Sequence, residues 1–148
     1  MPFDDILKSI QNVRDNIPEF FEDAALKHAK EITRLNKENL SKGKLNTGQN
    51  ITPKYSESYR KKKGFSTPDG KVTGRFYNSI FVTQTNVPAQ MQVVSDYVVD
   101  GFALANKLEE DYSEDIYSIT DGQRNSLLEN KIAPEVVKRI NDGLKIWL

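Results

Sequence analysis

Positive charge and aromatic rings gather between residues 54 and 75, the stretch of the chain best equipped to bind a partner. It contains seven basic residues against two acidic ones. Ammonium and guanidinium groups bind phosphates or carboxylates, and aromatic rings stack on bases or anchor protein interfaces. We therefore expect this surface to meet either an acidic protein partner or nucleic acid. The candidate partner-binding residues are Tyr55, Tyr59, Arg60, Lys61, Lys62, Lys63, Phe65, Arg75, Phe76 and Tyr77.

A second charged stretch, residues 109–115, carries five acids and no cation. Dense carboxylates can perform general acid/base chemistry or hold a divalent metal. At the end of a predicted helix they are more often simply solvated. We interpret the run as an acidic surface that pairs with the lysines around Lys61 of a neighbouring subunit.

The sequence contains few of the residue patterns that catalytic sites require. His28 is its one histidine, it has no cysteine, and no serine lies in a nucleophile elbow. A lone histidine on a predicted helix face lacks the second ligand that a metal site needs. We expect no catalytic residue, no metal site and no cofactor, and hence a protein that is not an enzyme.

The first third of the chain is predicted to be helical. Apolar residues from Phe3 to Val13 recur at helical spacing, which predicts a helix to about Asp15. Pro18 predicts a kink or a restart, because proline suits the first turn of a new helix. A second apolar stripe continues from Phe20 until Gly43 supplies a stop, and residues 41–52 then have the composition of an exposed loop.

A β-hairpin is predicted after the basic loop. One or two helical turns capped by Thr73 lead into a strand from Ile80 to Thr85, and residues 90–95 alternate weakly as its partner. This alternation places Ile80 on one face and Phe81 on the other. A further helix is expected over residues 102–108, and a capping box at Thr120 predicts another. Pro134 restarts the last helix.

These elements predict an α+β fold in which a long N-terminal helix packs on a small antiparallel sheet and the C-terminus is helical. One domain is expected over residues 1–148. It divides into a helical region (1–43), a basic loop (44–75), a hairpin (76–97) and a helical C-terminal region (98–148).

Composition narrows the range of partners. The 21 basic and 21 acidic residues give a net charge of zero, so no overall field attracts nucleic acid or an anionic membrane. No apolar run approaches the roughly 18 residues of a membrane span, and acids stand where a signal peptide would be basic. We expect a soluble protein of a reducing compartment that binds no membrane.

The central stretch also resembles a known family. Tyr55-Ser56, Tyr59, Lys63-Gly64 and Pro68-Asp69 precede Thr73-Gly74-x-Phe76-Tyr77-x-Ser79-Ile80. Together they resemble the phage tail-completion, or minor tail, proteins of the head-tail junction. One departure is that Tyr97 leads to Asp100-Gly101, whereas relatives commonly continue from tyrosine-alanine to glutamate and glycine.

The resemblance implies a structural virion protein that completes the tail or joins head to tail. Its partners would be other tail or neck proteins, and it would form a homo-oligomeric ring in the assembled particle. It would be found in the virion, and in the host cytoplasm during assembly. The alternative that the residues leave open is a small nucleic-acid-binding protein that uses the basic, aromatic-bearing loop.

Overall fold

The structure, a computed structural model, describes residues 2–51, 75–96, 98–99, 102–103 and 116–144. It confirms a mixed fold with a long N-terminal helical region, a small antiparallel hairpin and a helical C-terminal region. The helices are α1 (Phe3–Lys27), α2 (Ala29–Ser41), α4 (Arg75–Asn78), α6 (Asp121–Leu127), the π-helix η2 (Leu128–Ile132) and α7 (Ala133–Leu144). The strands are β1 (Ile80–Gln84), β2 (Met91–Ser95), β3 (Val98–Val99) and β4 (Phe102–Ala103).

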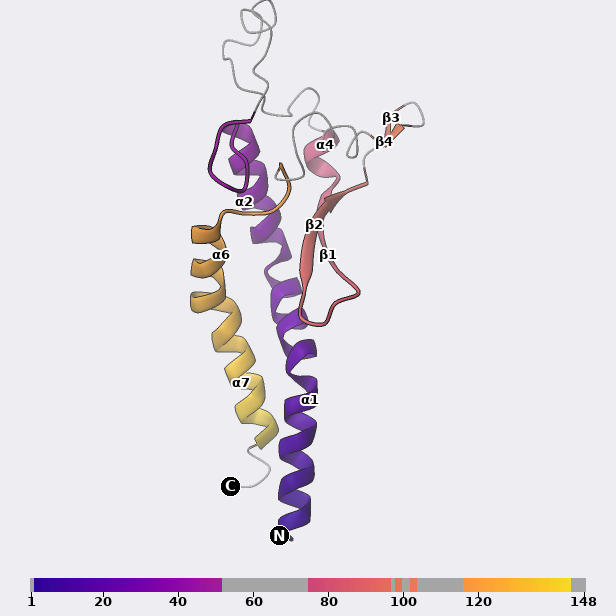
Figure 1. Cartoon of the computed structure of the whole chain (residues 1–148), viewed down its shortest axis with the longest axis vertical. Coiled ribbons are helices and arrows are strands. Elements are labelled where there is room, and N and C mark those ends of the chain that lie inside the picture. Colours follow the sequence, from indigo (N-terminus) through magenta and orange to yellow (C-terminus); the bar gives the residue numbers. More distant parts are fainter. Residues whose placement is uncertain (1, 52–74, 97, 100–101, 104–115, 145–148) are drawn as a thin grey trace, which may run out of the picture.

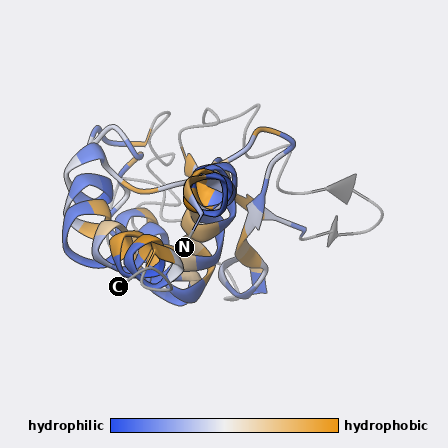
Figure 2. Ribbon diagram, turned by 90° about the horizontal axis from the view of Figure 1, so that it is seen from below, coloured by the Kyte–Doolittle hydropathy of each residue, from blue (hydrophilic) through white to orange (hydrophobic). Residues whose placement is uncertain are grey.

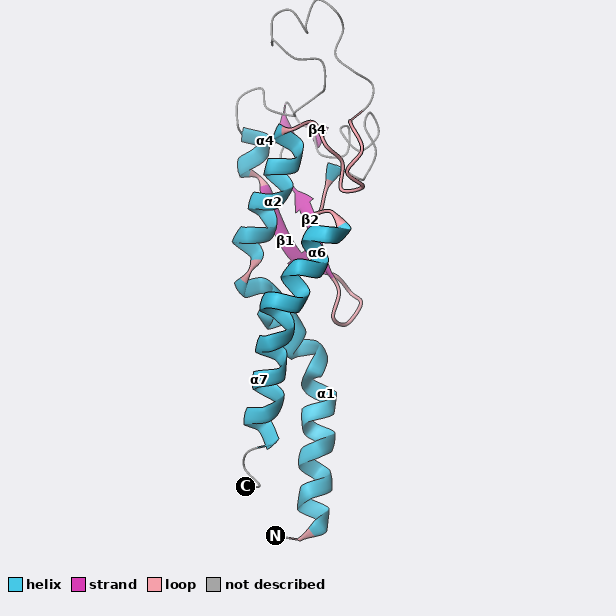
Figure 3. Ribbon diagram, turned by 90° about the vertical axis from the view of Figure 1, so that its left-hand side faces the viewer, coloured by secondary structure: helices cyan, strands magenta, loops and turns pink. Residues whose placement is uncertain are grey.

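Two helical columns and one hairpin make up the body of the molecule (Figure 1). α1 and α2 form the central column, and α6, η2 and α7 run back beside it in the opposite direction. The hairpin of β1 and β2 packs beside the upper part of the central column, where β1 contacts α2 and the end of α1 (Figure 3). Viewed along the helices, each carries hydrophobic residues on part of its circumference and hydrophilic residues on the rest (Figure 2).

The N-terminal helix is not restarted at Pro18. α1 continues through this residue, and the helical column is interrupted ten residues later at His28. There the backbone turns tighter, since the N–H of His28 donates to the carbonyl of Ala25, three residues back. Pro18 therefore removes one backbone hydrogen bond from α1 without ending the helix.

The hairpin has the predicted strands and alternation. β1 pairs with β2 in the register Ile80↔Ser95 to Gln84↔Met91. Ile80 and Val93 point into the core, whereas Phe81 on the other face is 42% exposed. The turn needs a positive φ at Ala89 (57°), and the Glu22 carboxylate of α1 accepts a 3.0 Å hydrogen bond from its N–H.

Two predictions about connecting segments are wrong. Residues 102–103 form strand β4, which pairs with β3, so the helix expected from residue 102 does not begin there. Residues 104–108 of that expected helix lie outside the described part of the chain. The segment after α2 is also not simply exposed, because Leu45 and Ile51 are buried. A bridge between Lys44 and Asn50 brings those two apolar side chains to the core.

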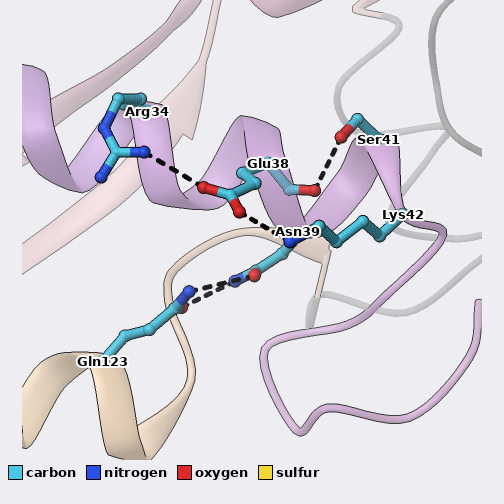
Figure 4. Close-up of polar contacts among 6 residues, drawn as sticks. All are labelled: Arg34, Glu38, Asn39, Ser41, Lys42 and Gln123. Atoms are coloured by element: carbon cyan, nitrogen blue, oxygen red, sulfur yellow. Dashed lines mark hydrogen bonds and ion pairs between the residues drawn. The ribbon is translucent and has the colours of Figure 1, made fainter.

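Polar contacts hold α6 against α2. The predicted capping box is present: the Thr120 hydroxyl accepts from the Gln123 N–H, and the Gln123 side chain accepts from the Thr120 N–H. The same Gln123 amide exchanges two hydrogen bonds with Asn39 of α2, at 2.9 and 3.2 Å (Figure 4). Arg34 and Lys42 pair with Glu38 on the neighbouring surface of α2. Gln123 therefore both caps α6 and bonds it to the central column.

The core lies where the upper halves of the two columns meet the hairpin. It combines residues from α1, α2, the 116–119 segment, the hairpin and the C-terminal column. Its buried members are Ala24, Ala25, Ile32, Leu40, Leu45, Ile51, Phe76, Tyr77, Ile80, Val93, Ile116, Tyr117, Ile119, Leu127 and Ile132. The lower half of α1 contributes only Val13 as a buried apolar side chain.

Candidate functional site

Most of the sequence-predicted binding residues lie outside the part of the chain that the structure describes. These are Tyr55, Tyr59, Arg60, Lys61, Lys62, Lys63 and Phe65. The acidic run of residues 109–115 lies outside it as well. The predicted pairing between the basic loop and this acidic run therefore stays a prediction.

The three remaining candidates separate into surface and core. Arg75 is exposed at the start of α4. Phe76 and Tyr77 are only 5% and 8% exposed, and the Phe76 ring lies 6.4 Å from that of Tyr117, centroid to centroid. Four-residue α4 turns these rings inward because it leads directly into a strand whose inner face is the core. Their burial gives Phe76 and Tyr77 a packing role and removes them from the predicted contact surface.

The serine of the same motif has a clear local role. The Ser79 hydroxyl donates to the carbonyl of Phe76 at 2.6 Å and shares a second hydrogen bond with the Ser95 hydroxyl of β2. It thus ties the last turn of α4 to the end of the hairpin. Within the described residues, the Phe76-Tyr77-x-Ser79-Ile80 pattern builds a helix-to-strand corner and does not itself form a binding surface.

Within the described regions, the histidine and carboxylate side chains do not cluster at one site. His28 is half-buried at the break between α1 and α2. No group of three or more histidine or carboxylate side chains there has a geometry that could hold a metal ion. Likewise, none of the described helices is long and apolar enough to cross a membrane.

Exposed apolar side chains form a first candidate surface on the lower half of α1. Phe3 is 70% exposed and Ile10 is 50% exposed, and Leu7 and Ile17 are also exposed. Their spacing of three, four and seven residues places them on one face of the helix. This set of four residues is called the α1 stripe below. It continues, toward the N-terminus, the face that buries Ala24 and Ala25 in the core.

The described part of α7 reaches the level of Val13, so it runs beside Ile17 but not beside Phe3, Leu7 and Ile10. A side chain on Gly143, near the end of α7, would come within 2.8 Å of the Val13 side chain, so the two helices touch closely at that level. α1 continues past the last described turn of α7 (Figures 1 and 3). Above Val13 the columns are fixed by ion pairs of Lys27 with Glu135 and of Arg139 with Asp23. Apolar side chains that lie exposed along one helix face make this face a candidate for protein association.

A groove beside β2 forms a second candidate surface. Its volume is about 340 Å³, and it lies between the hairpin, the central column and the C-terminal column. Its lining is mostly apolar and is called the β2 groove below. The residues are Phe21, Ala25, Ile32, Val82, Ala89, Gln90, Met91, Gln92, Val93, Ser118, Ile119, Arg124, Leu127, Leu128 and Ile132.

Ion pairing between the columns shifts several carboxyl groups. A hydrogen bond from Lys27 lowers the pKa of Glu135 below its usual value of 4.5, with further help from the charges of Lys27 and Arg139. A hydrogen bond from Lys131 likewise lowers the pKa of Glu31. Each of these pairs joins the two columns. Their shifts therefore belong to the scaffold and do not indicate a catalytic acid or base.

The α1 stripe and the β2 groove differ in how far the sequence alone could predict them. The α1 stripe was present as a helical period, but periodicity alone cannot distinguish a face that is buried in the chain's own core from one that is left open. The β2 groove joins residues as distant as Phe21 and Ile132, and no local pattern brings them together.

The chain was compared with models of protein families, with curated proteins and with solved structures, and none of the three comparisons found a match.

Proposed function

We propose that this protein is a structural component of a phage or prophage virion that completes the tail or joins head to tail. It works through oligomeric protein-protein association and has no enzymatic role. Two observations support the proposal: the resemblance of residues 55–80 to the tail-completion family, and the exposed apolar side chains of the α1 stripe. Its partners are other tail or neck proteins, and its working location is the virion, reached from the host cytoplasm during assembly.

The observation that carries the proposal is the α1 stripe. A helix of a monomeric protein normally turns its apolar face to its own core. Here Ala24 is covered, whereas Phe3, Leu7, Ile10 and Ile17 are exposed on either side of the buried Val13. Burying such a face against a neighbouring subunit removes apolar surface from water, at about 25 cal/mol per Å². An assembled particle supplies that neighbour.

A homo-oligomeric ring is the arrangement that suits this role. A junction protein has to match the rotational symmetry of the structures that it joins, and repeated head-to-tail contacts between identical subunits close into a ring. The basic loop would add contacts of opposite charge, with Lys61, Lys62 and Lys63 meeting acids of the adjacent subunit. The exposed Phe81 ring adds further apolar surface on the hairpin.

Deleting the gene from an inducible prophage and imaging the particles tests the proposal. We expect DNA-filled heads that lack attached tails, and restoration of tails when the wild-type chain is supplied. Supplying the Lys61→Glu, Lys62→Glu, Lys63→Glu triple variant should fail to restore tails, although the variant folds. Normal particles after deletion would overturn the proposal. A triple variant that assembles normally but loses salt-sensitive affinity for DNA would favour the nucleic-acid alternative.

A further inference from the structure

The β2 groove is bordered by the edge of a strand. Three consecutive strand residues, Met91, Gln92 and Val93, line it, together with the turn residues Ala89 and Gln90. Successive side chains of a strand point to opposite faces, so a surface lined by all three strand residues faces the edge of β2 and not one side of the sheet. β1 contributes only Val82 to the lining. Within the described part of the chain, β1 is also the one strand paired with β2.

The register shows which backbone groups this edge presents. Thr85 donates its N–H to the carbonyl of Gln90 at 3.1 Å, which makes these two residues a hydrogen-bonded pair at the hairpin end. Such pairs alternate along an antiparallel ladder, so Met91 and Val93 belong to the pairs that do not bond to β1. Their N–H and C=O groups therefore point away from β1, toward the groove.

An apolar wall stands opposite this edge. Leu127, Leu128 and Ile132 come from α6 and η2, and Phe21 and Ile32 come from the central column. The wall is fixed, because the Gln123 amide binds both the α6 cap and Asn39. The site thus combines directed backbone hydrogen bonding on one side with apolar burial on the other.

We propose that the β2 groove binds an extended segment of a partner protein, which adds an antiparallel or parallel strand to β2. The segment carries aliphatic side chains at alternate positions, so that they enter the wall side of the groove while its backbone pairs with Met91 and Val93. Recognition by strand addition takes affinity from main-chain hydrogen bonds and specificity from pockets for alternate side chains. This inference goes beyond the proposed function and does not depend on it.

The backbone groups at the groove select this occupant over others. The N–H and C=O groups of a helix are bonded to one another along its length, so a helix could not pair with Met91 and Val93, whereas an extended segment presents free N–H and C=O groups. A second copy of the chain cannot bring its own β2 to this edge, because that β2 is walled by its own α6 and η2. A single extended segment needs only the space beside one strand.

Selection from a yeast-displayed library of random heptapeptides tests the proposal on the full chain. We expect enriched peptides with aliphatic residues at alternate positions. The most enriched peptide is then synthesised in two N-methylated forms, one blocking each alternate set of backbone N–H groups. Methylation of the set that pairs with β2 should weaken binding at least tenfold, while methylation of the other set should leave it unchanged. Because only the peptide is altered, this comparison cannot be confused by misfolding of a protein variant.

A protein variant gives an independent arm. Leu128→Glu places a charge in the wall of the groove and should weaken peptide binding at least tenfold. Val137→Glu is the matched control, since Val137 is exposed on α7 outside the groove, and it should bind as the wild type does. The proposal is overturned if no peptide is enriched, if both methylated forms bind equally, or if enriched sequences have helical spacing. Self-association of the wild type that Leu128→Glu abolishes would assign the groove to a second copy and overturn it too.

Discussion

The side-chain amide of Asn36, on α2, donates a 2.7 Å hydrogen bond to the carbonyl of Ser118, a residue whose φ is +91°. The same amide donates to the carbonyl of Ile116 at 3.0 Å. Both partners are acceptors, so they fix which end of the Asn36 side chain carries the nitrogen. Asn36 is thus a buried clip that holds residues 116–118 to the central column, and these residues lead directly into α6 and the β2 groove.

Asn36→Ala should lower the free energy of unfolding by about 2 to 4 kcal/mol. The variant leaves two carbonyl groups without their donor and opens a cavity in a buried position. Urea unfolding measures the change. Asn125→Ala, at an exposed position on α6, is the matched control and should stay within about 0.5 kcal/mol of the wild type. Equal stability of the two variants would show that the clip does not hold the fold.

Ser118→Gly should stabilise the protein by about 1 kcal/mol relative to Ser118→Ala. Both variants remove the hydroxyl, but only glycine adopts a φ near +91° without strain from its side chain. At an ordinary position the order is reversed, because glycine loses more backbone entropy on folding than alanine does. The sign of the difference in unfolding midpoint between the two variants therefore reports the strain directly. An alanine variant more stable than the glycine variant would contradict it.

Local patterns in the sequence were sufficient for some elements. The capping box at Thr120 involves residues three apart, and the hairpin alternation involves neighbours, so both were predictable before the structure. Of the kink or restart predicted at Pro18, the restart does not occur, because α1 continues through this residue from Phe3 to Lys27. Phe76 and Tyr77 were predicted as partner-binding residues, and their burial in the core gives them a packing role instead.

The surfaces were harder to predict for a physical reason. Whether the apolar face of α1 is covered depends on which parts of it α7 packs against, and no feature of residues 3–17 encodes that. The β2 groove depends on the distance between the hairpin and a helix more than thirty residues later in the chain. The basic loop was identified from composition alone, and its role stays a prediction.

Protonation of Glu135 should weaken the joint between the columns. Because the hydrogen bond from Lys27 lowers its pKa in the folded state, the unfolded chain binds this proton more tightly. The resulting stabilisation is fully present above the usual value of 4.5 and is lost as the pH falls through the lowered folded value. Unfolding midpoints measured from pH 7 downward should show this loss.

Lys27→Met is the control for that pH dependence. It removes the main cause of the lowered pKa, so stability should fall less steeply below pH 4.5 than in the wild type. Added salt should reduce the difference between the two proteins, because the Lys27 side chain is largely exposed and its charge is screened. Parallel pH profiles for the two proteins would rule out this pair as a source of acid sensitivity.

Charging the α1 stripe should block assembly while leaving the subunit folded. Leu7→Glu with Ile10→Glu places two carboxylates on a face that is exposed in the isolated chain, so the unfolding midpoint should change little. In a ring those carboxylates would be buried without partners, which is strongly unfavourable. We expect native mass spectrometry to show small species for both the wild type and the variant, because the ring contacts need the assembled particle as a template. Imaging of particles should show a closed ring for the wild type and tailless heads for the double variant.

Val87→Glu charges an equally exposed apolar residue on the hairpin turn, away from the stripe, and should assemble normally. Normal tails with the double variant would remove the stripe from the assembly contacts, and a single copy per particle in the wild type would refute the ring itself.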